Sequence, residues 1–87
     1  MLVSIVIPVF NESKTIFEIL KKVNEIKDFN KEIIIINDGS TDNTKEIIKK
    51  NCSNLYSKFI TYKENKGKGH ACRKGLMQVE GQIVIIQ

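Results

Sequence analysis

Runs of β-branched apolar residues alternate along this chain with segments in which apolar residues recur every three or four positions. The four isoleucines at 33–36 form an unbroken apolar run. Such a run is typical of a strand covered on both faces in a parallel sheet. Between residues 12 and 28 the apolar side chains instead fall on one helical face, and they are Ile16, Ile19, Leu20, Val23 and Ile26. The pattern therefore predicts strands alternating with amphipathic helices.

Seven elements follow from this pattern. We expect strands at residues 2–7, 31–37, 58–62 and 82–87, and helices at about 12–28, 43–51 and 70–79. Apolar side chains of the later helices should face the sheet, namely Ile47, Ile48, Ala71, Leu76, Met77 and Val79. Side-chain oxygens can satisfy free N–H groups of a first helical turn, and the candidates are Asn11 or Ser13 for the first helix and Thr41 or Asp42 for the second.

This order of elements, β-α-β-α-β-α-β, predicts an α/β fold with a parallel sheet and right-handed crossovers. We predict the strand order 3-2-1-4 within a single domain at residues 1–87. The order reverses at strand 1, so a ligand-binding switch point should lie at the carboxyl ends of strands 1 and 4. Three polar loops gather at that edge, at residues 8–12, 38–44 and 65–73.

Composition restricts the chain to one small domain of ordinary soluble type. It has 87 residues, 41% hydrophobic and 28% charged, and its apolar runs are far shorter than the ~20 residues of a membrane helix. The first four residues lead straight into a strand pattern without a basic n-region or a small-residue cleavage site, so we expect no leader sequence. Cys52 and Cys72 match no CxxC or zinc spacing. We therefore expect free thiols and a cytoplasmic location. The net charge of +4 favours anionic partners, although lysines on helix faces often form only a solvated surface.

Two common nucleotide motifs are absent. A dinucleotide site requires G-x-G-x-x-G after the first strand, where this chain has Pro-Val-Phe-Asn-Glu. Gly67 and Gly69 follow the third strand instead, and Cys72 stands at the position of the third glycine. The P-loop pattern G-x-x-x-x-G-K-[ST] does not occur either. The sequence thus argues against NAD-dependent dehydrogenases and P-loop NTPases.

Two carboxylates and a cationic loop fall at the expected edge. Asp38 could accept hydrogen bonds from a nucleobase, and Glu12 from ribose hydroxyls or base N–H groups, because an ionised carboxylate is acceptor-only. Lys68 and Arg73 flank a helix start whose free N–H groups attract anions, so this loop suits a diphosphate. The alternative is that the lysines are mobile surface charges and the glycines only form a turn.

Three segments of the chain together resemble a known family. Similar N-terminal segments occur in family 2 glycosyltransferases of the GT-A fold, and here they are Ser-Ile-Val-Ile-Pro-Val-Phe-Asn-Glu, Asn-Asp-Gly-Ser-Thr-Asp-Asn-Thr and Asn-Lys-Gly-Lys-Gly-His-Ala-Cys-Arg-Lys-Gly. The third segment is most similar to the dolichyl- or polyprenyl-phosphate mannosyltransferase and glucosyltransferase branch. The resemblance covers the whole chain, and it implies the Rossmann-like, donor-nucleotide-binding half of such an enzyme.

The resemblance implies a nucleotide-diphospho-sugar donor, a UDP- or GDP-sugar, and the residues that contact it. Those expected at the nucleoside are Pro8, Val9, Asn11 and Glu12, with Asp38 at the base. Those expected near the ribose and phosphates are Gly69 and Arg73, and the full set also includes Gly39, Ser40 and Lys68. A polyprenyl-phosphate acceptor is implied as well, which would place the protein at the cytoplasmic membrane face.

The chain departs from the family pattern at its end. The family carries a metal-binding Asp-x-Asp motif after the fourth strand, and this chain stops at Gln87, where that motif would begin. The acceptor half and the catalytic carboxylate are also unmatched. A metal Lewis acid neutralises leaving-group charge, so we expect little or no transfer by these residues alone. We expect no catalytic or metal-binding residue here, a truncated or shortened chain, and Mg or Mn only in a full-length homologue.

Two other functions remain open from the sequence. The chain could be a non-catalytic α/β module whose basic face binds RNA or acidic lipid, with steep salt dependence. It could also be a structural module that pairs an exposed edge strand with another chain, including a second copy of itself. We favour donor binding over both, and a nucleotide sugar over nucleic acid, because three separate segments agree on it.

Overall fold

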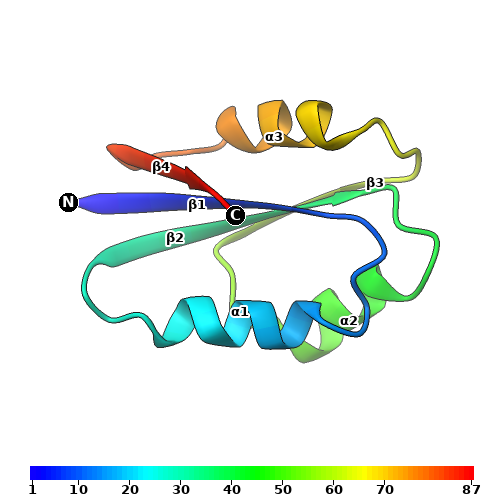
Figure 1. Cartoon of the computed structure of the whole chain (residues 1–87), viewed down its shortest axis with the longest axis horizontal. Coiled ribbons are helices and arrows are strands. Elements are labelled where there is room, and N and C mark those ends of the chain that lie inside the picture. Colours follow the sequence, from blue (N-terminus) through cyan, green and yellow to red (C-terminus); the bar gives the residue numbers. More distant parts are fainter.

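Four strands alternate with three helices in the computed structural model, which describes residues 1–87 (Figure 1). The elements in chain order are β1 (Leu2–Val9), α1 (Ile16–Glu25), β2 (Asn30–Asp38), α2 (Thr44–Asn51), β3 (Lys58–Tyr62), α3 (Lys68–Leu76) and β4 (Ile83–Ile86). All neighbouring strands pair in parallel, in the order β3-β2-β1-β4. The structure confirms the predicted α/β fold and the strand order 3-2-1-4.

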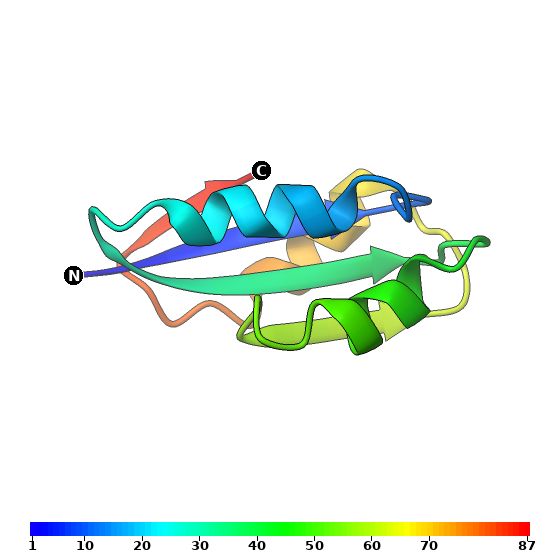
Figure 2. The same cartoon turned by 90° about the horizontal axis from the view of Figure 1, so that it is seen from below.

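Helices cover both faces of this sheet. The helices α1 and α2 lie on one face and α3 lies on the other (Figure 1 and Figure 2). The larger core lies beneath α1 and α2 and contains Val3, Ile5, Ile7, Val9, Ile16, Leu20, Val23, Ile33, Ile35, Ile48 and Cys52. The smaller core lies beneath α3 and contains Val6, Ile34, Ile36 and Ala71. The isoleucine run of β2 alternates between the two cores, which explains why it contains no polar residue.

The first strand is longer than the sequence suggested. It extends through Pro8 to Val9, two residues beyond the predicted end at residue 7. Proline lacks the N–H group that a ladder requires, and it is tolerated where one side of a strand is open. That condition holds here, because β4 pairs with β1 only as far as Val6.

The first helix starts later than predicted. The N–H groups of Thr15 and Ile16 donate to the carbonyl oxygen of Glu12 at 3.1 and 2.9 Å, so a turn precedes α1. Thr15 holds the N-cap position without a side-chain capping bond. The prediction that Asn11 or Ser13 caps this helix is therefore wrong, and the periodicity of apolar residues could not reveal the turn.

Three apolar residues that were expected in the core are exposed instead. Ile26 is 43% exposed beyond the end of α1, and Leu76 and Met77 at the end of α3 are 42% and 75% exposed. The buried stripe of α3 runs through Ala71 and Gly75, one helical turn apart. Gly75 allows the helix to approach the sheet closely, and this approach turns the larger neighbours outward.

The edge strand β4 is apolar on both faces and poorly covered. Its residues are each exposed by 38–46%, and they are Ile83, Val84, Ile85 and Ile86. The register with β1 places alternate members on the α1 face and on the α3 face, because paired residues of parallel strands share a face. No helix in the chain combines the length and the apolarity needed to cross a membrane.

Candidate functional site

The carboxyl ends of β1 and β2 and the segment before α3 enclose an open cleft of about 400 Å³. Its lining residues are Pro8, Val9, Phe10, Glu12, Asp38, Asn65, Gly67 and Lys68. Five of them belong to the set expected from the sequence, namely Pro8, Val9, Glu12, Asp38 and Lys68. Two acidic residues and one cation that are distant along the chain therefore line one cleft.

The other expected site residues do not line this cleft, and they are Asn11, Gly39, Ser40, Gly69 and Arg73. Three lining residues were not in the expected set: Gly67, which the sequence placed in the cationic loop, and Phe10 and Asn65, which sequence reasoning passed over. The signal for Phe10 was an aromatic residue directly after a strand end, and its side chain is 44% exposed. Asn65 gave no signal of its own, because a single asparagine in a loop usually indicates only a turn.

Asn11 joins the loop after β1 to the loop after β2. Its backbone is left-handed, with φ of +53°, which asparagine tolerates better than most residues. Its side-chain oxygen Oδ1 accepts the N–H groups of Thr41 and Asp42 at 2.8 and 3.3 Å, and its own N–H donates to Ser40 Oγ at 3.0 Å. Asp42 accepts the N–H of Thr44 at 3.0 Å, but Asn43 holds the N-cap position of α2, not Thr41 or Asp42 as expected. Asn11 therefore positions the loops rather than lining the cleft.

Glu12 is fixed at the cleft wall by its backbone. Its N–H donates to Thr44 Oγ1 at 3.0 Å, and its Oε2 accepts the hydroxyl of Thr15 at 2.6 Å. An ionised carboxylate has roughly four lone-pair sites, so one accepted hydrogen bond leaves most of its capacity free. Glu12 can still accept hydrogen bonds from a ligand.

Asp38 is mostly occupied by the protein itself. Its side chain is buried, and its Oδ1 accepts the N–H of Lys66 at 2.9 Å. Its Oδ2 accepts the N–H of Gly67 and the side-chain amide of Asn65, both at 3.1 Å. Three N–H donors fill most of the roughly four lone-pair sites of a carboxylate. Asp38 therefore holds the segment before α3 in place, and little of its acceptor capacity remains for a ligand.

Gly39 allows that segment to approach the end of β2. Its φ is +66°, and a Cβ built on it would lie 2.2 Å from the backbone nitrogen of Asn65. Both the left-handed backbone and this contact exclude larger residues. The close approach places the segment before α3 directly against Asp38.

The cationic side of the cleft is formed by the start of α3. Lys68 is its first residue and lines the cleft, and Gly67 at the N-cap has φ of +93°. No side chain caps the first turn, so its N–H groups and the positive end of the helix dipole can attract an anion. Arg73 lies one turn further on, and a Cβ on Gly69 would be 3.5 Å from its Nη1. Gly69 and Arg73 thus lie side by side just behind the cleft.

Tyr62 lies beside Asp38 on the neighbouring strand, where the two residues are paired in register. Its hydroxyl oxygen is buried and makes no hydrogen bond. Burial, together with the negative charge of Asp38, raises the pKa of Tyr62 to about 12. Its ring packs edge-on against His70, with centroids 5.6 Å apart. Tyr62 therefore serves as a neutral packing residue behind the cleft.

The chain offers no complete metal site. No group of three or more histidine, cysteine, aspartate or glutamate side chains is arranged to hold a metal ion. Cys52 and Cys72 are free thiols, and burial raises the pKa of Cys52. The chemistry available at the cleft is that of hydrogen-bond acceptors and one cation.

Comparison with known families decides the relationship. The family model described as "Glycosyl transferase family 2" matches residues 4–87. This chain belongs to glycosyl transferase family 2. A poly-beta-1,6-N-acetyl-D-glucosamine synthase of Staphylococcus aureus is 45% identical over 76 residues, which cover 87% of this chain and 18% of the synthase.

Solved structures of glycosyltransferases share the fold. The mannosyltransferase PcManGT from Pyrobaculum calidifontis, in complex with GDP-Man and Mn2+, has a TM-score of 0.86 and 26% identity, covering 94% of this chain and 25% of its own. The glucosyl-3-phosphoglycerate synthase from Mycobacterium tuberculosis, in complex with Mn2+, UDP and glucosyl-3-phosphoglycerate, has a TM-score of 0.77 and 25% identity, covering 98% and 32%. This family 2 chain therefore spans less than a third of the length of these relatives.

Proposed function

We propose that this family 2 glycosyltransferase chain binds the nucleotide-diphospho part of a UDP- or GDP-sugar donor in its cleft. The observation that carries the proposal is the meeting of Glu12, Asp38 and Lys68 in one cleft at the carboxyl edge of a parallel sheet. The solved structures of two related glycosyltransferases contain GDP-Man and UDP, respectively, and this supports the nucleotide class.

Each wall of the cleft suits one part of such a ligand. Phe10 and Pro8 offer apolar surface on which a base can stack. Glu12 has free acceptor capacity for ribose hydroxyls or base N–H groups. Lys68 and the uncapped first turn of α3 suit the diphosphate. Arg73, whose guanidinium packs beside Gly69 on the same helix, is the next cation along the chain that faces the first turn. The proposal gives Asp38 a smaller share of base recognition than its sequence position suggested.

Sugar transfer is not assigned to these residues. Both related structures contain Mn2+, whereas the residues of this chain form no cluster suited to a metal ion. A divalent ion neutralises leaving-group charge in such reactions. The proposed step for these residues is donor binding, in which this chain orients the nucleotide.

Calorimetric titration tests the donor proposal. UDP, GDP and their sugars should be titrated into the folded protein, and at least one should bind in the micromolar to millimolar range. Lys68→Ala should weaken binding by about three- to tenfold, since it removes a cation from the phosphates. Lys74→Ala, on an exposed part of the same helix outside the cleft, should leave binding unchanged. The proposal would be wrong if none of these ligands binds.

Two acceptor classes follow from the relatives. The motif resemblance implies a polyprenyl phosphate at the cytoplasmic membrane face, and the name of the staphylococcal relative implies a growing polysaccharide. Either class would meet the donor sugar outside the cleft described above. Incubation of the radiolabelled donor with each acceptor, using a protein that includes the catalytic half, would show which product forms.

Pairing through β4 is a second proposed activity. The strand exposes four apolar residues and an unpaired edge, and such edges accept strands from other chains. We expect concentration-dependent association in sedimentation experiments. Ile85→Lys should reduce this association because charges on an edge strand oppose pairing, whereas a monomer at all concentrations would exclude the activity.

A further inference from the structure

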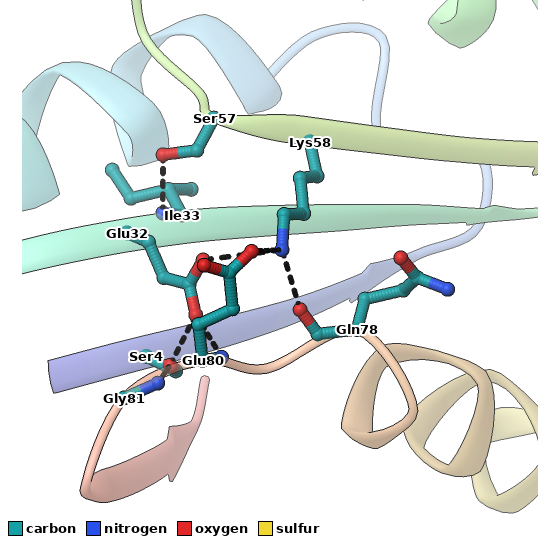
Figure 3. A network of polar contacts seen from close by, with 8 residues as sticks. All are labelled: Ser4, Glu32, Ile33, Ser57, Lys58, Gln78, Glu80 and Gly81. Carbon is teal, nitrogen blue, oxygen red and sulfur yellow. Dashed lines mark hydrogen bonds and ion pairs between the residues drawn. The ribbon is translucent and has the colours of Figure 1, made fainter.

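Three polar side chains lie side by side on the α3 face of the sheet, at the end opposite to the cleft (Figure 3). Ser4 of β1 pairs in register with Glu32 of β2, and Lys58 lies on β3. The same face further along carries the apolar core beneath α3. Burying Glu32 among these strands is unfavourable unless its carboxylate is paired, so its partners should reveal why it is there.

The partners come from the connection between α3 and β4. Glu32 Oε2 accepts the hydroxyl of Ser4 at 2.5 Å and the backbone N–H of Glu80 at 2.6 Å. Ser4 Oγ in turn accepts the N–H of Gly81 at 2.9 Å. A Cβ on Gly81 would lie 2.6 Å from Ser4 Oγ, so only glycine fits at this point. These hydrogen bonds therefore fix the position of the α3–β4 connection relative to β1 and β2.

Lys58 fastens the same connection from the other side. Its Nζ lies 3.5 Å from Glu32 Oε1 and 2.6 Å from Glu80 Oε2, and it donates to the carbonyl oxygen of Gln78 at 2.7 Å. Figure 3 shows both carboxylates turned toward this ammonium group. Both carboxylate oxygens of Glu32 face partners within the protein, and Glu32 is only 7% exposed. The cluster thus holds the chain and offers no room for a ligand.

The two ends of α3 are consequently fixed by two carboxylates of one strand. Asp38 accepts N–H groups of residues 66 and 67, just before α3, and Glu32 accepts the N–H of residue 80, four residues after the last residue of α3. Between them, Gly75 brings the helix so close that a Cβ would lie 2.4 Å from Val6 Cγ1. A helix held at its start, held through the connection after its end and packed closely in the middle has little freedom to shift on the sheet.

We propose that Glu32 is a positioning residue for the cleft: it fixes the far end of α3 and thereby keeps Lys68 at the near end in place. The inference rests on the proposed donor site only for the identity of the ligand. Loss of the Glu32 contacts would leave α3 held by Asp38 at its start and by packing at Gly75. The helix could then tilt about these points and change the orientation of Lys68, which distinguishes Glu32 from a local stabilising contact.

Glu32→Gln tests the proposal, because it replaces one acceptor oxygen by an NH2 group that faces other donors. We expect the amide NMR signals of Gly67, Lys68 and Gly69 to move, although these residues do not contact position 32. Affinity for UDP or GDP should fall by about three- to tenfold. Glu18→Gln, which removes an exposed charge on α1, should change neither quantity.

Two outcomes would overturn the proposal. In the first, Glu32→Gln shifts only the signals of residues 4, 58 and 77–82, and those of 67–69 stay in place. In the second, nucleotide affinity is retained in a variant whose connection has loosened. If the wild-type protein binds neither nucleotide, the donor proposal fails and the amide shifts alone decide this one. Should Glu32→Gln not fold, Ser4→Ala, which removes two hydrogen bonds of the same cluster, is judged by the same signals.

Discussion

Glu32 and Asp38 lie six residues apart on β2, and each accepts backbone N–H groups from one of the two segments that flank α3. Six residues of strand span roughly 20 Å, whereas the nine residues of α3 span only about 14 Å. The strand is thus long enough to hold a turn at each end of the helix. β2 therefore fixes the position of α3, whose first turn forms the cationic side of the cleft.

Removing the charge of Asp38 should destabilise the protein. In Asp38→Asn one oxygen becomes an NH2 group that faces the N–H group of either Lys66 or Gly67, so at least one donor loses its partner. We expect a loss of about 1–3 kcal/mol in the free energy of unfolding, measured by urea denaturation. Asp28→Asn, at an exposed position, serves as the control, and equal midpoints for the two variants would contradict the holding role.

Alanine variants of the two glycines with positive φ, Gly39 and Gly67, allow the cost of backbone strain to be measured apart from the cost of steric overlap. Gly39→Ala introduces both, since its Cβ would strike the Asn65 backbone, whereas Gly67→Ala introduces strain alone because nothing lies within 4 Å. Strain at Gly67 should cost about 1–2 kcal/mol, and Gly39→Ala should cost more. Urea denaturation of both variants measures the difference. Equal losses would mean that the contact between the loops is dispensable.

Two glycines within α3 should respond in opposite directions. A Cβ at Gly75 would overlap Val6 and Ile36, so Gly75→Ala should lower the free energy of unfolding by about 1–3 kcal/mol. Gly69→Ala meets only Arg73 at 3.5 Å and should raise it by up to about 1 kcal/mol through helix propensity. Thermal denaturation distinguishes the signs, and a neutral Gly75→Ala would show that α3 tolerates a larger distance from the sheet.

Stability should depend on Glu32 in acid. Burial disfavours its ionised form, but hydrogen bonds from Ser4 and Glu80 and the Lys58 ammonium outweigh this, so the pKa of Glu32 lies below its usual 4.5. The ionised group therefore contributes stability above pH 4.5, and the contribution is lost as the pH falls below that value.

The difference in unfolding free energy between wild type and Glu32→Gln should accordingly be largest near neutral pH and smaller in acid. Urea denaturation at about pH 7 and about pH 3 measures it. A difference that stays constant between the two conditions would show that the carboxylate is not the charged partner in this cluster.

The sheet could be predicted because its signals are local and repeated. Unbroken β-branched runs marked the strands, and their alternation with helical periods left the order 3-2-1-4 as the natural topology. The helix boundaries were less accessible. The turn on the Glu12 carbonyl delays α1, and the small residues Ala71 and Gly75, rather than Leu76, face the sheet in α3. Periodicity favours large apolar residues and misses a helix that packs through glycine.

The candidate site was predictable in outline, since the loops after the strands of a parallel sheet indicated Glu12 and Asp38, the start of a helix indicated Lys68, and the family resemblance indicated Pro8 and Val9. What the sequence could not show is which acceptors are already used. A carboxylate such as Asp38 at a strand end resembles a ligand contact, yet its oxygens already accept hydrogen bonds from three donors of the protein. Glu32 was overlooked for the converse reason: a single glutamate at a strand start usually faces water.

Strand β4 sets a demand on whatever covers it. Alternate side chains point to opposite flanks of the sheet, Ile83 and Ile85 to one and Val84 and Ile86 to the other. A single added strand would satisfy the free main-chain N–H and C=O groups of β4 but would leave its side chains on both faces of the sheet exposed to water. Any segment or protein that buries β4 completely must therefore contact both faces of the sheet beside it.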